Sequence, residues 1–170
     1  MPDKETLRRA KADKAEGKAP TTQAGEFIRE EMEHIREGKH GARSTKQAIA
    51  IGLSKARRAG VKLPPPEPGK ASAKTRRSAE RAYREGQDGP AHKTSAKRSQ
   101  AITNALKREG HEAASSQSLS KQAREQSHKR TVTERREIGK KAARTRLAHQ
   151  SSAERSRIAR KAAKTRASRG

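Results

Sequence analysis

One stretch of the sequence, STKQAIAIGLSKARRAG from Ser44 to Gly60, constrains the fold more strongly than any other. Ser44 and Gln47 have the spacing of a capping box, which begins a helix. Ile49 and Leu53 stand four residues apart, so a helix places them on one apolar face. The closing glycine suits the left-handed residue that commonly ends a helix. The stretch therefore predicts a helix whose basic residues stay near water, namely Lys46, Lys55, Arg57 and Arg58.

The segment KQAIAIGLSKA, Lys46 to Ala56, resembles a family of small basic bacterial proteins of unknown function. The family is built on a KQAIAI-type motif that is followed by Leu-Ser and an alanine. Some longer members are described as DNA-binding proteins, although the family has no established activity. The resemblance therefore implies a role with nucleic acid and defines no reaction.

A second helix is predicted over about residues 23–37, where apolar residues recur at intervals of three and four. The connection over 38–43 has a length typical of antiparallel helices. We therefore expect a helical hairpin at 21–63, closed by Val61 and Leu63. Its predicted core is formed by Phe27, Ile28, Met32, Ile35, Ile49 and Leu53.

Large apolar side chains are scarce in the chain as a whole. Leu, Ile, Val and Phe together number 16 of 170 residues, while 43 Lys and Arg face 19 Asp and Glu. Chains of such composition and a net charge of +24 are expected to be largely disordered. The expected fold class is therefore mostly α, a small helical hairpin with a largely disordered, conditionally helical basic tail. So small a core favours marginal stability or a homodimer formed through the hairpin.

Breaker residues and charge divide the chain into five expected regions. The clearest boundary is PPPEPGK, an extended polyproline-type spacer. The regions are a charged arm at 1–20, the hairpin at 21–63, a proline-rich hinge at 64–71, a weakly helical basic segment at 72–127 and a basic tail at 128–170.

The basic tail contains one unit twice. TERREIGKKAARTR from Thr133 recurs twenty residues later as AERSRIARKAAKTR from Ala153. Thr131 and Ser151 each precede a glutamate by three residues, a capping-box spacing that predicts two helices. With so few apolar residues, these helices are expected to fray alone and to form on an anionic surface. The segment REIGKKAA also resembles the glycine-lysine motif of bacterial stress-induced proteins, although Ala142 stands where that motif favours glycine.

The charge of the tail points to nucleic acid. Residues 128–170 hold 15 Lys and Arg against three glutamates, a density that suits sequence-independent contacts with phosphates. Phe27 and Tyr83 are the only aromatic residues, so a base-stacking platform is lacking and duplex DNA is favoured over RNA. The predicted phosphate contacts are Lys140, Lys141, Arg144, Arg146, Arg160, Lys161, Lys164 and Arg166, with Arg57 and Arg58 as a second patch. The expected location is the nucleoid, in the cytoplasm.

Other functional classes find little in the sequence. There is no cysteine and no glycine-rich nucleotide loop, so we expect no enzyme, no catalytic residue, no cofactor and no small-molecule substrate. His34 and His40 are interpreted as ordinary surface residues, and no metal is expected. No apolar run is long enough to span a membrane, and no membrane partner is expected. Two alternatives stay open: an adaptor, protein-binding or stress-associated, whose hairpin binds a partner while the tail only solubilises, and an RNA-binding protein.

Overall fold

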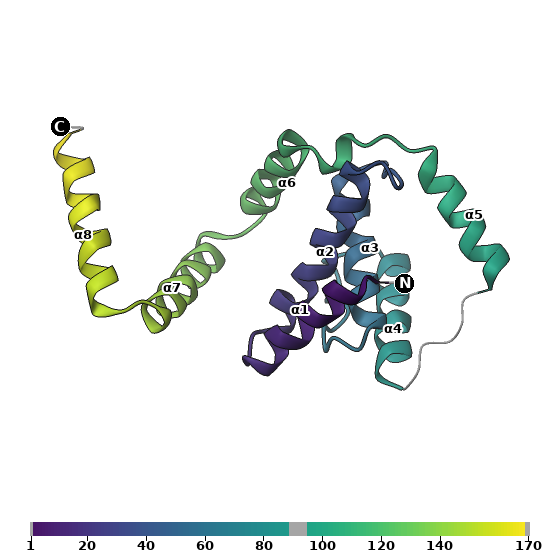
Figure 1. Ribbon diagram of the computed structural model, residues 1–170, viewed down its shortest axis with the longest axis horizontal. Helices are drawn as coiled ribbons and strands as arrows, with labels where there is room; N and C mark the ends of the chain where they lie inside the picture. Colours follow the sequence, from purple (N-terminus) through teal and green to yellow (C-terminus); the bar gives the residue numbers. More distant parts are fainter. Residues whose placement is uncertain (1, 89–94, 169–170) are drawn as a thin grey trace. The chain divides into compact units, whose positions relative to one another are not determined.

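The computed structural model describes residues 2–88 and 95–168. Within these ranges the chain forms eight α-helices and one short 3-10 helix, with no strand (Figure 1). It divides into two compact units, Met1–Gln122 and Ala123–Gly170. The elements are α1 (Lys4–Ala15), α2 (Pro20–Arg36), α3 (Thr45–Arg58), α4 (Ala73–Gln87), α5 (Ala96–Lys107), η1 (Glu112–Ala114), α6 (Ser116–His128), α7 (Val132–His149) and α8 (Ser152–Ala167).

The predicted hairpin is present as α2 and α3. The Ser44 side chain accepts a hydrogen bond from the backbone N–H of Gln47, as the sequence predicts. The Gln47 side chain returns to the backbone N–H of Arg43, one residue before the expected one, at 2.9 Å. Gly60 has a φ of 85°, the left-handed conformation expected of the residue that ends the helix.

The other helices of the first unit that contact this hairpin pack around it. α1 packs against α2, α4 packs against α3, and η1 contacts both helices of the hairpin. Gly52 of α3 lies directly against α2, because a Cβ atom at this position would come within 2.8 Å of the Ile28 Cα atom. The absence of a side chain there lets the two helix backbones approach closely.

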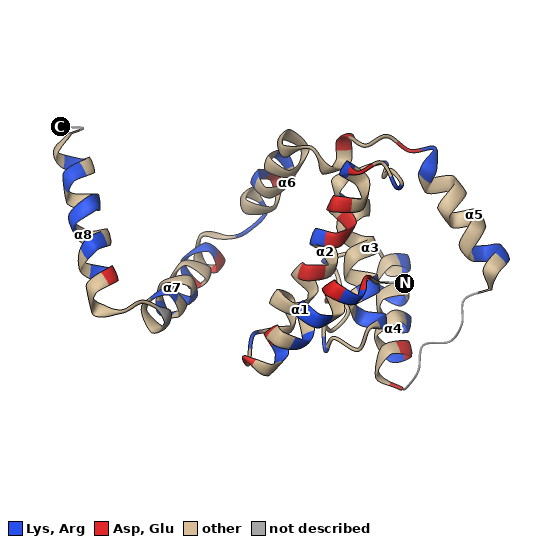
Figure 2. Cartoon of the chain, in the orientation of Figure 1, with Lys and Arg blue, Asp and Glu red and all other residues tan. Residues whose placement is uncertain are grey.

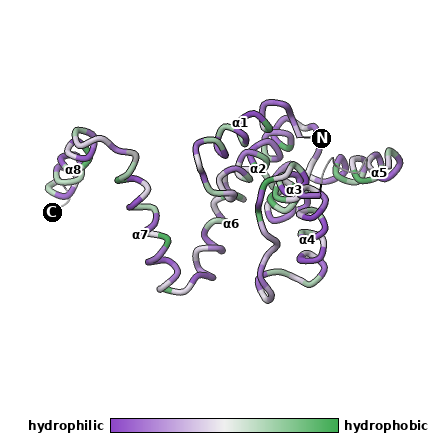
Figure 3. The backbone as a smooth tube through the Cα atoms, turned by 90° about the horizontal axis from the view of Figure 1, so that it is seen from below, coloured by the Kyte–Doolittle hydropathy of each residue, from purple (hydrophilic) through white to green (hydrophobic). Residues whose placement is uncertain are grey.

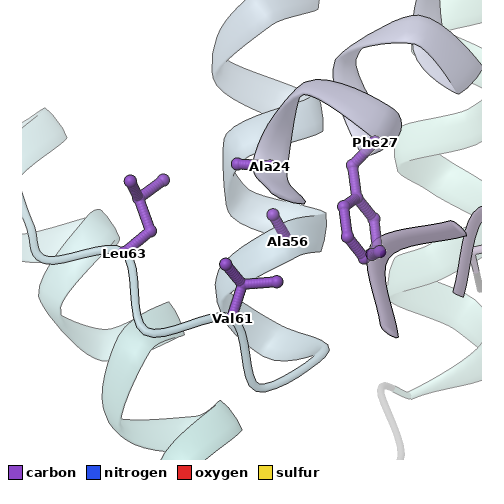
Figure 4. Packing of buried hydrophobic residues seen from close by; sticks show 6 residues of the cluster. Ala24, Phe27, Ala56, Val61 and Leu63 are labelled. Carbon is purple, nitrogen blue, oxygen red and sulfur yellow. The ribbon is translucent and has the colours of Figure 1, made fainter. Parts of the chain in front are cut away.

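Two apolar clusters hold the unit together, and seven of their twelve buried members are alanine. The first surrounds Phe27 and is shown in Figure 4. Its members are Ala10, Ala24, Phe27, Ala56, Val61 and Leu63, with Leu7 and Leu53 packed against them. The second consists of Met32, Ile35, Ala42, Ala48, Ala113 and Ala114, with Ile28, Ile49 and Leu119 packed against them. All six side chains predicted for the hairpin core therefore lie in or against these clusters.

The chain around η1 docks on the hairpin largely through its backbone. The Thr45 hydroxyl donates to the carbonyl oxygen of Ala113 at 2.7 Å, and the Arg36 guanidinium donates to that of Ala114 at 3.0 Å. The Ala42 N–H donates to the carbonyl oxygen of Gly110 at 3.0 Å. The hairpin is therefore covered by other segments of the same chain, namely the region around η1, helix α1 and residues 61–63. They bury part of the hairpin surface within the chain itself, and formation of a homodimer stays a prediction.

The expected fold class is wrong. The first unit is a multi-helix domain, not a lone hairpin, because small alanine side chains and backbone hydrogen bonds replace the missing large aliphatic residues. The basic tail is not disordered, because α7 and α8 cover most of it. Both helices are rich in Ala, Arg, Lys and Glu, which have high helix propensity, and both begin with complete capping boxes. Hydrophilic residues predominate along them, interrupted by short hydrophobic stretches (Figure 3).

Candidate nucleic-acid interface

The two helices of the tail begin in the same way. In α7 the Thr131 hydroxyl accepts from the Glu134 N–H at 3.1 Å, and the Glu134 carboxylate accepts from the Thr131 N–H at 2.7 Å. Ser151 and Glu154 make the same pair of bonds at the start of α8, at 3.2 and 3.0 Å. The predicted capping boxes are therefore confirmed. Because both repeats start in one register, equivalent residues occupy equivalent positions on the two helices.

Each helix carries three cations at positions i, i+1 and i+4, which fall within about a third of its circumference at 3.6 residues per turn. We call each set a cationic stripe. The stripes are Lys140, Lys141 and Arg144 on α7 and Arg160, Lys161 and Lys164 on α8. Lys and Arg recur along both helices in Figure 2, where Asp and Glu are few. All six stripe residues are exposed.

The other predicted contacts of the tail lie elsewhere on the helices. Arg146 and Arg166 are exposed, but helical periodicity places them more than a quarter turn from the stripe of their helix. Ile138 and Ile158 are about half exposed, at 47% and 49%, and Ile138 lines a hollow on α7 together with Lys141 and Arg146. On α7, Arg146 therefore shares a surface with Lys141, although it lies outside the stripe itself.

The stripes are nearly free of carboxylate partners. Lys140 pairs with Glu137 at 2.9 Å, and both side chains are well exposed. Among the residues that the structure describes, no ion pair involves the other five stripe residues. The acidic residues at the helix starts are engaged in capping. Most of this charge is therefore available to an external anion.

In the first unit, by contrast, many cations are neutralised locally. Arg9 pairs with Glu26 at 2.6 Å and Lys18 with Asp13 at 2.8 Å. Ionic contacts of this kind satisfy the cation within the fold. The number of Lys and Arg residues in the first unit therefore overstates the positive charge that it offers to an external anion.

The predicted second patch does not form as expected. Arg57 is buried, 7% exposed, and its guanidinium donates to the carbonyl oxygens of Leu63 and Pro64 at 3.2 and 3.1 Å. Burial lowers the pKa of Arg57. The expectation that Arg57 stays near water is wrong. The chain after α3 turns back over Arg57, and the hydrogen bonds of the Arg57 guanidinium hold this returning segment in place. Arg58 is half exposed and pairs with Glu85 of α4 at 3.3 Å.

Two histidines that were expected to be ordinary surface residues lie close together in the first unit. The side chains of His34 and His40 are each only 14% exposed, so the interpretation of both as surface residues is wrong. They lie beside Glu31 and Asp3. The spacing of His34 from the two preceding glutamates was a usable signal. The position of Asp3 beside His34 could not be predicted from the sequence, because it depends on how α1 packs against α2.

Comparison with known proteins places a family match in the first unit only. Residues 11–67 match a family of unknown function, DUF6496. The matched range includes α2 and α3 and contains the KQAIAI-type segment, but it ends before α7 and α8. No curated protein and no solved structure matches the chain. In the ranges 2–88 and 95–168, no helix has the length and apolar character needed to cross a membrane.

Proposed function

We propose that the protein binds duplex DNA through its phosphates, without base preference, and that the cationic stripes of α7 and α8 make the principal contacts. The observation that carries this proposal is the exposure of six cations in two equivalent sets, five of which lack an ion-pair partner among the described residues. Each phosphate that such a cation neutralises releases condensed counterions, which drives binding. The proposed location is the nucleoid.

The form of the stripes suits the backbone of a duplex. Positions i and i+4 are about 6 Å apart along a helix, so the cations of each stripe form a short row. The phosphates of one DNA strand also lie in a row, and the two rows can face each other. Base readout in single-stranded RNA relies on aromatic stacking, and α7 and α8 contain no Phe, Tyr or Trp. These features favour duplex DNA over RNA.

The test is a titration of fluorescently labelled duplex DNA with the full chain at several salt concentrations. The variant K140Q/R144Q/R160Q/K164Q removes two cations from each stripe. If each contacts a phosphate, the slope of log K against log salt becomes shallower by about 3 to 4. Affinity at low salt falls accordingly.

A matched control, K11Q/K14Q/K74Q/R77Q, removes four exposed cations of the first unit that have no ion-pair partner among the described residues. It makes the same change in net charge away from the stripes. Equal loss in the two variants would contradict a localised interface. Preference for an RNA competitor of equal length would replace DNA with RNA, and absence of binding near physiological salt would favour a hairpin that binds a protein partner.

A further inference from the structure

A cluster of carboxylates and imidazoles lies where α1, α2 and the loop before α3 meet. His40 Nε2 is 3.4 Å from Glu31 Oε1, and His34 Nε2 is 3.2 Å from Asp3 Oδ2. The two imidazole rings meet edge to face, with centroids 6.0 Å apart. Glu31, His34 and His40 each offer one donor atom, and these atoms all lie within 4.8 Å of one another.

Glu31 is the least satisfied member of the cluster. Its side chain is 1% exposed, and the carboxylate oxygen Oε1 has no hydrogen-bond partner. Lys55 Nζ approaches Oε2 to 2.7 Å as an ion pair, which leaves Oε1 facing His40. The neighbouring Glu30, also buried, is bonded to the Asp3 N–H, Lys55 and Thr6. A buried carboxylate oxygen without a hydrogen bond is rare in folded proteins and calls for a partner.

The charges of the cluster do not balance. Asp3, Glu30 and Glu31 bring three carboxylates, while Lys55 is the one permanent cation that pairs with this group among the described residues. Lys39 lies nearby but pairs with Glu37 at 2.9 Å. With both imidazoles neutral, the cluster carries an excess of two negative charges. A divalent cation would neutralise that excess.

We infer that Glu31, His34 and His40 bind a divalent transition-metal ion of the zinc type. Two imidazole nitrogens and one carboxylate oxygen are a ligand set that suits zinc, whereas calcium and magnesium prefer oxygen alone. Bonds of about 2.0 to 2.2 Å in tetrahedral geometry place ligand atoms about 3.3 to 3.5 Å apart, close to the separation of Glu31 and His40. The fourth position is left to water.

Asp3 is a positioning residue for this site. Its hydrogen bond engages one ring nitrogen of His34 and leaves the other for the metal, the usual arrangement of a metal-binding histidine. The ion would tie α2 to the loop that carries His40, and Asp3 would link both to the start of α1. In a unit whose clusters are mostly alanine, such a link compensates for a small core.

The test uses the full chain, stripped of metal by chelation and free of nucleic acid. Calorimetric titration with Zn²⁺ is expected to show saturable binding of one ion per chain. At free Zn²⁺ a hundredfold above Kd, the unfolding equilibrium constant falls about 100-fold. The variants H34N and H40N each weaken binding by about tenfold or more. The control H128Q, at the exposed end of α6, leaves it unchanged.

One measurement needs no variant. In the imidazole ¹H–¹⁵N spectrum of the unmodified chain, Zn²⁺ at one equivalent is expected to shift the signals of His34 and His40 alone among the six histidines. Absence of saturable binding, or shifts at other histidines only, would overturn the inference. H34N is expected to leave the DNA titration unchanged, so failure of this site and failure of the DNA proposal are separate outcomes.

Discussion

The ammonium group of Lys55 lies 2.7 Å from the carboxylate of Glu31, in the interior of the first unit. It also reaches Glu30, at 3.1 Å. The Lys55 side chain is 22% exposed, so its stem passes through the fold and its charge ends inside it. One cation on α3 thus holds two adjacent carboxylates on α2.

Replacing Lys55 with methionine is expected to destabilise the metal-free protein strongly. The change keeps the stem but leaves two buried carboxylates without their cation, so the free energy of unfolding falls by about 3 kcal/mol. Urea unfolding in the presence of EDTA measures it. K11M, an exposed lysine of α1, is the control and changes stability by less than about 0.5 kcal/mol. Equal effects would mean that the Lys55 charge contributes nothing specific.

Acid is expected to unfold the first unit through Glu30. Burial alone would raise the pKa of Glu30, but hydrogen bonds from the Asp3 N–H and Thr6, together with Lys55, lower it overall from its ordinary value of 4.5. A lowered pKa in the folded state contributes stability that is present above pH 4.5 and is lost as the pH falls through the folded value. Urea midpoints measured from pH 7 to pH 3 follow this loss.

The variant E30Q is expected to flatten that acid dependence, whereas E33Q, exposed on the same helix, keeps the slope of the unmodified chain. Both measurements are made without metal, so that they report the carboxylate alone. An unaltered slope in E30Q would assign acid sensitivity to other groups. Asp3 is the first to consider, since its hydrogen bond with His34 lowers its pKa as well.

Two glycines are expected to respond in opposite directions when changed to alanine. G52A places a Cβ atom 2.8 Å from the Ile28 Cα, so the helices must separate at a loss of about 1 to 3 kcal/mol. G25A lies in α2 with no atom within 4 Å of its new methyl group and gains about 0.5 to 1 kcal/mol of helix propensity. Thermal unfolding of the two variants compares them. A neutral G52A would mean that α2 and α3 pack less closely.

Removal of a cap is expected to loosen the tail one helix at a time. T131A deletes the hydroxyl that accepts from the Glu134 N–H and weakens the start of α7 by about 1 kcal/mol, while α8 keeps its own cap. Backbone ¹³C chemical shifts report helix content residue by residue. T133A, two positions later and outside the cap, is the control. Loss of helix in α8 as well would show that the two helices are coupled.

Much of the fold could be predicted where the signal is local. Local signals, made by residues within one turn of one another, decide where several helices begin or end. They include the start at Ser44, the stop at Gly60 and the capping boxes at Thr131 and Ser151. The apolar spacing of α2 and α3 identified the hairpin core for the same reason. Those parts of the structure agree with the sequence because neighbours along the chain decide them.

The remainder depends on partners distant in sequence and without a side-chain signature. Thr45 and Arg36 donate to the carbonyl oxygens of Ala113 and Ala114. Because every residue has a backbone carbonyl, the sequence does not indicate where such a contact forms. Arg57 reads as a surface cation until the backbone of Leu63 and Pro64 folds over it. The contact of Asp3 with His34 depends on how α1, which follows Asp3, packs against α2. Disorder of the tail was predicted from hydrophobicity, whereas its helices depend on caps and propensity.

The closed caps of α7 and α8 have an evolutionary consequence. Each repeat carries its own start signal and its own stripe, and its helix is specified by residues inside a period of twenty. A tandem copy inserted in frame would therefore extend the protein by one more ready-made helix, and a deletion would remove one cleanly. If the stripes bind phosphates as proposed, selection could change the affinity of such a chain in discrete steps, by adding or removing repeats.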